Sequence, residues 1–281
     1  MPPPSRTRSC WSICPRLETR HFKCFTWIAD YRTGVSALRW GLHDETRGFP
    51  MNEHREHRLA VGILGAGEIG STLGKLLAQA GHEVMLSSRH PEARAGEAAA
   101  LGCRIGTLEE AAAFGEIVIA ALPLSALGEI PVNTLAGKVV IDTMNYYPPR
   151  DGAIAVFDEY RATTSERVAQ QLEGARVVKA FNAILAYDLP REERPPVEGG
   201  RRALPVAGDD EEAKALVGAL HAQLDFDVLD AGPLADSWRF ERAKPAYCIP
   251  LNHTQLRAAL AAAERDKELP HGSWRRKPRP E

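Results

Sequence analysis

A glycine-rich turn at residues 65–70 is the part of the chain whose residue types and spacing point most clearly to chemistry. It directly follows a continuous apolar run, residues 59–64, and opens a segment of helical character, as a dinucleotide-binding turn requires. Gly65 would permit the tight turn, Gly67 would let the backbone approach a pyrophosphate, and Gly70 would let the helix pack on the strand. The helix N-terminus would offer N–H groups to the phosphates, so the predicted cofactor-binding residues are Gly65, Ala66, Gly67, Glu68, Ile69 and Gly70. A strand-to-helix turn that binds no ligand is the alternative.

The end of the second apolar run indicates which dinucleotide the turn would bind. NAD-binding chains carry Asp or Glu about twenty residues after the turn, where the carboxylate holds the ribose hydroxyls. This chain has Ser87-Ser88-Arg89-His90 at that place. A carboxylate would repel a 2′-phosphate, whereas a serine hydroxyl and a guanidinium would bind it. We therefore predict NADP(H) as the cofactor, held by Ser88 and Arg89, with His90 or Arg94 adding charge; an Arg89 that only ends the strand in solvent is the alternative.

A second ligand should bind beside the same turn, because ligands of open α/β sheets lie outside the carboxyl ends of the strands. The segments expected there are 122–124, 143–149 and 182–186, which supply aromatic rings, apolar side chains, prolines and the amides of Asn145 and Asn182. They contain no Ser/His/Asp grouping, no close pair of carboxylates and no His/Cys cluster. A carbonyl or imine reductase needs a proton donor, whereas hydride transfer between two conjugated heterocycles needs mainly stacking and alignment. The pocket favours the second chemistry, and we predict no catalytic acid or base.

Several other residues with chemical potential have structural interpretations. Asp142 ends a strand and could act as a base, but capping of the next turn is the commoner role of such a residue. Lys179 lies within a strand, where an edge position or a salt bridge is commoner than catalysis. His82 precedes the second strand, at the edge of the sheet away from the expected site. Cys103 and Cys248 are isolated, which favours burial as small apolar residues.

These residues depend on a scaffold of alternating strands and helices. Apolar runs with the length of buried parallel strands predict strands at 59–64, 83–87, 117–121, 138–142, 176–181, 204–207 and 226–229. Helices are predicted at 68–79, 91–100, 210–224, near 251–265, and before residue 176 with Thr164 or Ser165 as the cap. The alternation predicts an α/β fold, a doubly wound and mostly parallel Rossmann sheet with a short C-terminal helical extension. An apolar stripe in the last helix should pack on the sheet or on a second subunit; it consists of Leu256, Ala259, Leu260 and Ala263.

Composition places the chain among globular proteins and excludes several other classes. Its 281 residues are 44% hydrophobic and 26% charged, and the net charge is −2. This near-neutral balance argues against a nucleic-acid partner that binds through bulk charge. No apolar stretch approaches the ~18–20 residues of a membrane span, and five cysteines are too few for a disulfide scaffold. We therefore predict a cytoplasmic protein with no membrane partner.

The two ends of the chain differ from its middle. We predict a disordered extension over 1–57, with Met51 as the favoured functional start because it opens a polar lead-in to the first strand. A zinc site in this extension is a minor alternative, since the common ligand spacings are not matched by Cys10, Cys14, His21 and Cys24. Residues 58–150 would form the dinucleotide-binding half, 151–268 the second half of the sheet with the C-terminal helical part, and 269–281 a disordered basic tail.

Beyond the glycine turn and Ser88-Arg89, three stretches carry a more specific resemblance: residues 177–182, 206–210 and 230–234. Over about residues 59–248 the chain resembles the NADPH-dependent reductases of coenzyme F420, an 8-hydroxy-5-deazaflavin. The resemblance extends to membrane ferric reductases that use the same domain. It implies hydride transfer between NADP(H) and F420, with the small-molecule cofactors as partners and a homodimer as the assembly.

The resemblance also implies where the two rings would lie. The nicotinamide would lie near Leu122, Pro123, Ile184 and Ala186, with the deazaflavin stacked on its exposed face. From the residues alone, two other functions stay open. One is an NADPH-dependent reductase of a flavin or of a small carbonyl or imine substrate, and the other is an NADP(H)-binding sensor without turnover.

Overall fold

The computed structural model describes residues 58–270 and 272–273, within one compact unit that spans Asn52–Glu281. The expectations for the N-terminal extension, for its zinc ligands and for most of the basic tail concern residues outside this described part. The strands are β1 (Ala60–Leu64), β2 (Glu83–Ser87), β3 (Arg104–Gly106), β4 (Ile117–Ala120), β5 (Val139–Asp142), β6 (Arg176–Lys179), β7 (Ala203–Gly208) and β8 (Asp227–Asp230). The α-helices are α1 (Glu68–Gln79), α2 (Pro91–Ala100), α3 (Leu108–Phe114), α4 (Pro148–Asp151), α5 (Ala155–Asp158), α6 (Thr164–Gln171), α7 (Glu211–Gln223) and α8 (His253–Ala261). Short 3-10 helices are η1 (Leu124–Glu129), η2 (Val132–Thr134), η3 (Ala186–Asp188), η4 (Arg191–Glu193) and η5 (Leu234–Phe240).

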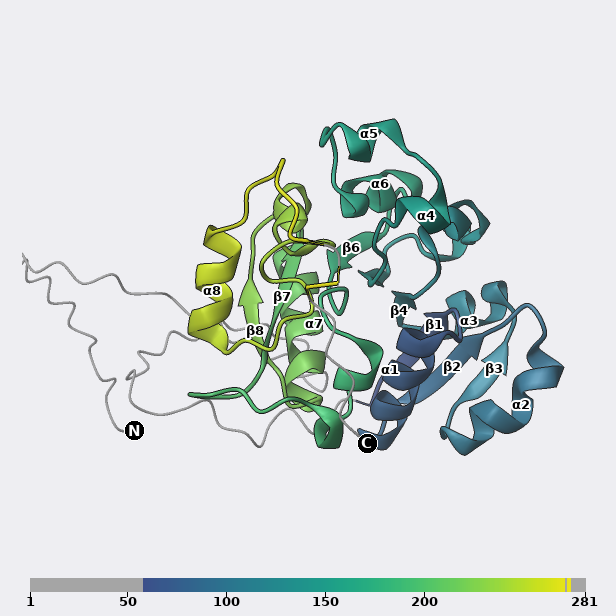
Figure 1. The fold of residues 1–281 in the computed structure, drawn as a ribbon. Coiled ribbons are helices and arrows are strands. Elements are labelled where there is room, and N and C mark those ends of the chain that lie inside the picture. The colour runs from purple at the N-terminus through teal and green to yellow at the C-terminus, as the bar shows by residue number, and fades with distance from the viewer. Residues whose placement is uncertain (1–57, 271, 274–281) are drawn as a thin grey trace, which may run out of the picture. The chain divides into compact units, whose positions relative to one another are not determined.

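The strands form a sheet in the order β3-β2-β1-β4-β5-β6-β7-β8 (Figure 1). Neighbours from β3 to β6 pair in parallel, β6 pairs antiparallel with β7, and β7 pairs in parallel with β8. The predicted doubly wound, mostly parallel fold is therefore confirmed. The bounds of α1, β2 and α2 are those predicted, whereas the short strand β3 at the edge of the sheet was not predicted.

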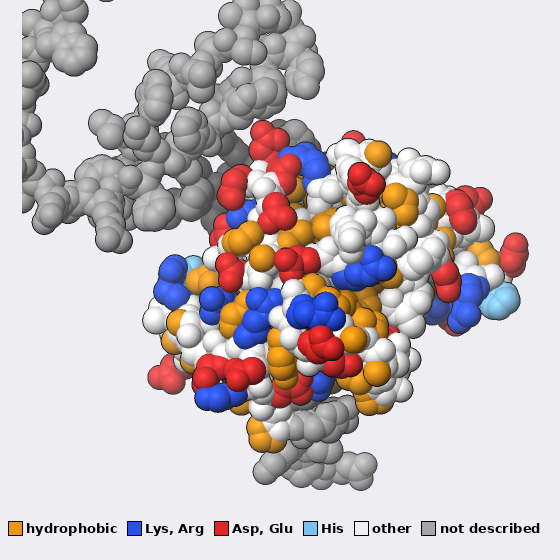
Figure 2. All heavy atoms as spheres, turned by 90° about the horizontal axis from the view of Figure 1, so that it is seen from above, with side chains coloured by type: hydrophobic (Ala, Val, Ile, Leu, Met, Phe, Trp, Pro, Cys, Tyr) orange, Lys and Arg blue, Asp and Glu red, His pale blue; other side chains and the backbone are white. Residues whose placement is uncertain are grey.

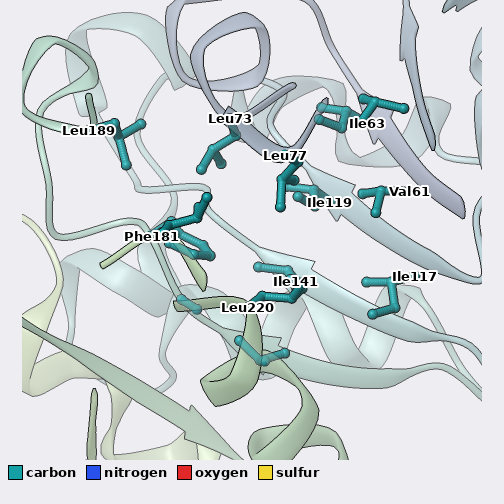
Figure 3. Packing of buried hydrophobic residues seen from close by; sticks show 14 of the residues in the cluster. Val61, Ile63, Leu73, Leu77, Ile117, Ile119, Ile141, Phe181, Leu189 and Leu220 are labelled. Atoms are coloured by element: carbon teal, nitrogen blue, oxygen red, sulfur yellow. The ribbon is translucent and has the colours of Figure 1, made fainter. Parts of the chain in front are cut away.

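The helix after the glycine turn is held on the sheet by an apolar face. The buried residues of α1 are Gly70, Leu73, Gly74 and Leu77, whose spacing places them on one side of a helix. Leu73 and Leu77 belong to the same buried cluster as Ile63 and Ile119 of the central strands, and Figure 3 shows their side chains between helix and sheet. Burial of each leucine contributes about 1.5–3 kcal/mol, so the position of the helix N-terminus beside β1 is well defined.

The N-terminus of α6 corrects one prediction. Thr163 is the N-cap, because its side chain accepts a hydrogen bond from the N–H of Glu166 while the Glu166 carboxylate accepts from the N–H of Thr163. The prediction of Thr164 or Ser165 was wrong, since both residues lie inside the helix. Their hydroxyls are used elsewhere, in a buried network described below.

The reversal between β6 and β7 sends the turn after β7 to the amino end of β6. There Asp210 caps α7 by accepting from the N–H of Ala213, and both of its oxygens accept from Arg176 at 2.6 and 2.7 Å. The Arg176 guanidinium, together with the N–H of Ala213, lowers the pKa of Asp210 to about 2. Asp209 accepts from the N–H of Leu234, which joins this turn to the one that follows β8. Two of the stretches that carried the family resemblance therefore stabilise the part of the fold distant from the glycine turn.

The apolar stripe of α8 packs on the sheet of its own chain. Leu256 and Leu260 are buried in a cluster with Ala203 of β7, Leu229 of β8 and Phe240 of η5. The expectation that the stripe packs on the sheet is therefore confirmed. The stripe lends no support to the homodimer that the resemblance implied.

The surface of the described part shows few large apolar side chains. Among these residues the exposed large hydrophobics are Tyr160, Tyr187 and Leu269. Figure 2 shows one face of the molecule, on which acidic and basic side chains are interspersed with small hydrophobic areas. No helix within residues 58–270 is both long and apolar enough to cross a membrane.

His221 makes the stability of this fold depend on pH. Its ring is fully buried and stacked on Phe181 at 3.8 Å, and Nδ1 contacts the carbonyl oxygen of Val217, while Nε2 has no partner among the described residues. Burial lowers the pKa of His221 from 6.5 to about 4. Between those values the unfolded chain binds the proton more readily than the folded one, so stability is complete above pH 6.5 and declines as the pH falls toward 4.

We expect this titration to remove about 3 kcal/mol of unfolding free energy between pH 7 and pH 4. Urea unfolding of the wild type and of His221→Leu at several pH values measures it, because leucine has a similar volume and no proton to gain. The decline should be shallower in the variant by that amount. Parallel curves for the two proteins would contradict the assignment.

Candidate functional site

The glycine turn has the geometry of a phosphate cradle. Gly65 has a φ of +104°, and a Cβ there would lie 2.7 Å from the carbonyl oxygen of Ala121. A Cβ on Gly70 would lie 2.1 Å from the carbonyl oxygen of Gly65, so the helix and the turn touch at this point. A Cβ on Gly67 would meet nothing within 4 Å. Gly67 is also the N-cap of α1 and supplies no side chain to cap the first N–H groups of the helix. The turn therefore leaves space and hydrogen-bond donors where an anionic group would bind, and a dinucleotide pyrophosphate fits it.

Three side chains hold this turn in place, and sequence reasoning missed all three contacts. The hydroxyl of Ser87, at the end of β2, accepts a buried 2.8 Å hydrogen bond from the N–H of Gly65. Arg94 in α2 donates from Nη1 to the carbonyl oxygen of Ala66 at 2.7 Å, and Ser71 donates to the same oxygen at 3.0 Å. The sequence shows several serines near the predicted turn that could bond to it. The pairing of β1 with β2 is needed to show that the Ser87 hydroxyl is the one that contacts Gly65.

The residues predicted to select NADP(H) follow β2 directly. Because β2 lies beside β1, its carboxyl end is adjacent to the glycine turn. Ser88 is half-buried, and its hydroxyl accepts a 3.1 Å hydrogen bond from the N–H of His90. Arg89 and His90 are exposed, and neither forms an ion pair within the described part of the chain. A free guanidinium beside the phosphate cradle fits a 2′-phosphate on the ribose.

An open cavity of about 1060 Å³ adjoins the turn at the carboxyl ends of β1, β4 and β5. Its walls come from residues 67–69, 121–123, 143–145 and 147–150, together with Arg242. The predicted nicotinamide contacts Leu122 and Pro123 lie in this wall, as does Asn145.

Of the residues predicted near the two rings, three lie outside the cavity wall, namely Asn182, Ile184 and Ala186. Ile184 is 3% exposed, and its side chain packs in the apolar core. Asn182 is also buried; it donates to Oδ1 of Asn145 at 3.1 Å and accepts from Nδ2 of Asn145 at 3.0 Å through its backbone oxygen. A second hydrogen bond from Asn182 to the carbonyl oxygen of Phe240 fixes the amide pair. Asn182, which lies behind the cavity wall, therefore fixes the position of Asn145 in the wall.

A buried ionic network supports the loop that follows β5. The side chains of Asp142 and Lys179 are 0% exposed, and their nearest oxygen and nitrogen lie 3.0 Å apart. Asp142 also accepts from the N–H of Met144 at 2.8 Å and from the hydroxyl of Ser165 at 2.6 Å. Lys179 donates to the carbonyl oxygen of Met144 and to the hydroxyl of Thr164. The interpretations of Asp142 as a turn cap and of Lys179 as a salt-bridged residue are confirmed.

The remaining candidates are structural. His82 accepts at Nδ1 from the N–H of Leu59, and its Nε2 lies 2.6 Å from Oε1 of Gln223. Cys103 and Cys248 are buried, and burial raises the pKa of their thiols to about 11 and about 12. No cluster of His, Cys, Asp and Glu that could hold a metal ion occurs within the described part of the chain.

Comparisons with known proteins agree with this geometry. Residues 60–146 match the model of the family described as NADP oxidoreductase, coenzyme F420-dependent. Over these residues the chain is similar to that family. The F420-dependent NADP oxidoreductase match includes the glycine turn, the residues after β2 and the cavity segments up to residue 146. The match to this family agrees with the resemblance predicted from the sequence.

A curated relative and two solved structures extend the likeness. The metalloreductase STEAP3 of Rattus norvegicus is 32% identical over 197 residues, which cover 68% of this chain and 38% of that protein, so the chain spans about two fifths of this relative. A structure from Arthrobacter sp. fb24, provisionally assigned as an F420-dependent NADP-reductase, has a TM-score of 0.55 and 26% identity over 64% of this chain and 87% of its own. The hypothetical protein SMa0349 from Sinorhizobium meliloti has a TM-score of 0.53 and 26% identity over 69% and 91%.

Gly67→Ala should separate cofactor binding from folding. The new Cβ enters open space, so we expect the unfolding free energy to change by less than about 1 kcal/mol. The same Cβ occupies the space where a pyrophosphate would approach, so NADPH affinity should fall at least about tenfold. Gly70→Ala is the matched control, because its Cβ meets the Gly65 carbonyl and should cost about 1–3 kcal/mol of stability. Calorimetric titration and urea unfolding measure both; undiminished NADPH binding by Gly67→Ala would contradict the phosphate assignment.

Lys179→Met should destabilise the protein by about 3–5 kcal/mol, because it leaves the Asp142 carboxylate buried without its cation. Lys267→Met removes a surface pair with Glu264 whose side chains are 68% and 57% exposed, and it should cost less than about 1 kcal/mol. Urea unfolding of the two variants tests the contrast. Equal losses would show that the buried network does not hold the loop after β5.

Proposed function

We propose that this protein transfers a hydride between NADP(H) and the deazaflavin coenzyme F420, with the two rings stacked in the cavity beside the glycine turn. The observation that carries the proposal is the composition of the cavity wall. Its described ionisable residues are Glu68, Tyr147, Arg150 and Arg242; histidine, lysine and aspartate do not occur among them. A wall with one side-chain amide, several apolar side chains and three prolines suits the alignment of two flat rings, and hydride transfer between such rings does not require a proton donor.

The chain's own residues would bind and orient the cofactor. In this proposal the turn at Gly67 and the first N–H groups of α1 hold the pyrophosphate, while Ser88 and Arg89 hold the 2′-phosphate. NADPH, when bound, supplies the hydride. Leu122 and Pro123 give the nicotinamide a nonpolar contact and exclude water from one of its faces. Asn145, fixed by Asn182, offers a polar contact at a defined position.

The burial of Tyr147 is consistent with this chemistry. Burial raises the pKa of its hydroxyl, which pairs with the hydroxyl of Tyr247, so Tyr147 stays protonated at neutral pH. The raised pKa makes this phenol a weaker acid than a free tyrosine, and its hydroxyl already pairs with Tyr247, so we assign it hydrogen bonding and ring contact. The family resemblance further leads us to propose that the protein is a cytoplasmic homodimer. Light scattering of the purified protein tests the oligomeric state.

A second candidate is reduction of a flavin or a metal ion. It is favoured by the 32% identity with a metalloreductase over 197 residues. In this case the same cavity would align the nicotinamide with a flavin ring, and the acceptor would be the only difference.

A steady-state assay distinguishes the candidates. NADPH is mixed with oxidised F420, with FMN or with a ferric chelate, and the absorbance of each acceptor is followed, with NADH in place of NADPH as the control. Rapid loss of F420 absorbance with NADPH supports the proposal. Reduction of only FMN or iron would favour the second candidate. Binding of NADPH without oxidation by any acceptor would leave a sensor role.

Arg89→Glu should weaken NADPH binding about 10–100-fold, because a carboxylate would repel the 2′-phosphate. NADH lacks that phosphate, so its affinity should change less than about threefold. Arg257→Glu, on the exposed face of α8, makes the same charge change away from the cavity and should leave both affinities unaltered. Fluorescence titration of the wild type and both variants measures the dissociation constants for NADPH and NADH. Equal losses of NADPH and NADH affinity in Arg89→Glu would rule out the 2′-phosphate assignment.

A further inference from the structure

Two arginines from distant parts of the chain line the same cavity. Arg150 belongs to α4, and Arg242 follows η5. Both line the cavity that adjoins the glycine turn, and neither was predicted for the site. The proposed function uses this cavity but assigns no role to either guanidinium.

Arg150 is held rigidly while part of it remains exposed. Its Nε and Nη2 donate to the two oxygens of Asp151, both at 2.9 Å, and Nη2 also donates to the carbonyl oxygen of Asn145. The guanidinium lies 4.8 Å from the ring centre of Tyr147. The Arg150 side chain is nevertheless 42% exposed, and its Nη1 has no partner in the described part of the chain. A guanidinium fixed in this way loses little entropy when it binds an anion.

The carboxylate of Asp151 does not compete for the cavity. Its side chain is 0% exposed, and its oxygens also accept from the backbone N–H groups of Tyr147 and Ser125. Burial by itself would raise the pKa of Asp151, but the hydrogen bonds from Arg150 and Tyr147 lower it overall. Asp151 therefore pairs with the Nε and Nη2 edge of Arg150 from a buried position, and the Nη1 end of the guanidinium remains for a ligand.

Arg242 separates this cavity from a smaller one of about 60 Å³. Its partner Glu268 accepts from Nη2 at 2.9 and 3.0 Å and lines only the smaller cavity. Within the described residues, the other nitrogens of Arg242 form no hydrogen bond. The acidic partner thus lies on one side of Arg242, and the larger cavity lies on the other.

The two guanidinium groups line the same cavity as Tyr147. Arg150 lies over the ring of Tyr147, and Arg242 lines the same cavity as these two residues. Glu68, which lies in the first turn of α1, is the acidic residue among the described residues of the cavity wall. The wall therefore carries two guanidinium groups and one carboxylate.

We infer that Arg150 and Arg242 form a binding subsite for an anionic group, a phosphate or carboxylate, on the side chain of the hydride acceptor. The acceptor ring would stack in the cavity, and its anionic substituent would bind the two guanidinium groups beside Tyr147. This inference rests on the proposed function for the identity of the ring, but the anion subsite can be tested separately.

The test compares two deazaflavins by fluorescence titration of the NADP⁺-saturated protein. One is F420, and the other is its 8-hydroxy-5-deazariboflavin chromophore, which lacks the phosphate and carboxylate groups. The wild type should bind F420 at least about tenfold more tightly than the chromophore. In Arg150→Met and in Arg242→Met this preference should fall below about threefold. Arg239→Met is the matched control, since Arg239 pairs with Asp236 outside the cavity and its loss should leave the preference intact.

Two results would overturn the inference. The first is equal affinity of the wild type for the two deazaflavins. The second is an equal loss for both ligands in the two variants, which would show that the arginines only brace the loop after β5. If neither deazaflavin binds, the proposed acceptor is wrong, and the same comparison between FMN and riboflavin then decides the anion subsite. A preference for FMN that both variants abolish would retain the subsite, and equal binding would remove it.

Discussion

The buried pair of Asp142 and Lys179 is the interaction on which the architecture of the cavity depends. A buried ion pair is stable only when both charged groups form further hydrogen bonds. Here those bonds come from the backbone of Met144 and the hydroxyls of Thr164 and Ser165. The network joins β5, β6 and α6 at the point where the chain leaves the sheet. It therefore sets the course of the loop that carries Asn145 and Tyr147 to the cavity. The hydroxyls of Thr164 and Ser165 bond to this pair, and Thr163 is the N-cap of α6.

Features determined by local sequence could be predicted. Apolar runs followed by turns specify buried parallel strands, and the spacing of Leu73 and Leu77 specifies the face of α1 that meets the sheet. The glycine turn was recognised from the spacing of its glycines and its place between an apolar run and a helix, and in the structure each glycine either lies against a backbone atom or borders open space. Ser88 and Arg89 were placed correctly beside that turn, because a strand that follows the first helix pairs with the first strand.

Features that depend on tertiary placement could not be predicted. The apolar pattern of a strand is the same whether the strand is parallel or antiparallel to its neighbour. The local sequence therefore does not show that β7 runs antiparallel to β6 and carries Asp210 away from the cavity. Ile184 follows a strand at the expected edge, yet its side chain turns into the core, and sequence order does not reveal that choice. Arg242 enters the cavity wall from a segment beyond the last strand, although a lone arginine in such a segment is usually a solvated charge.

The central claim is that the cavity aligns the two rings so that the hydride passes directly between them. Reduction of F420 by NADPH carrying deuterium at the reactive C4 position tests it, with proton NMR of the reduced deazaflavin as the measurement. Carbon-bound hydrogen at C5 of the deazaflavin does not exchange readily with water, so the destination of the label is readable. The account predicts full transfer of deuterium to C5 with one stereochemistry. Loss of the label to solvent, or its appearance on both faces of the ring, would contradict it.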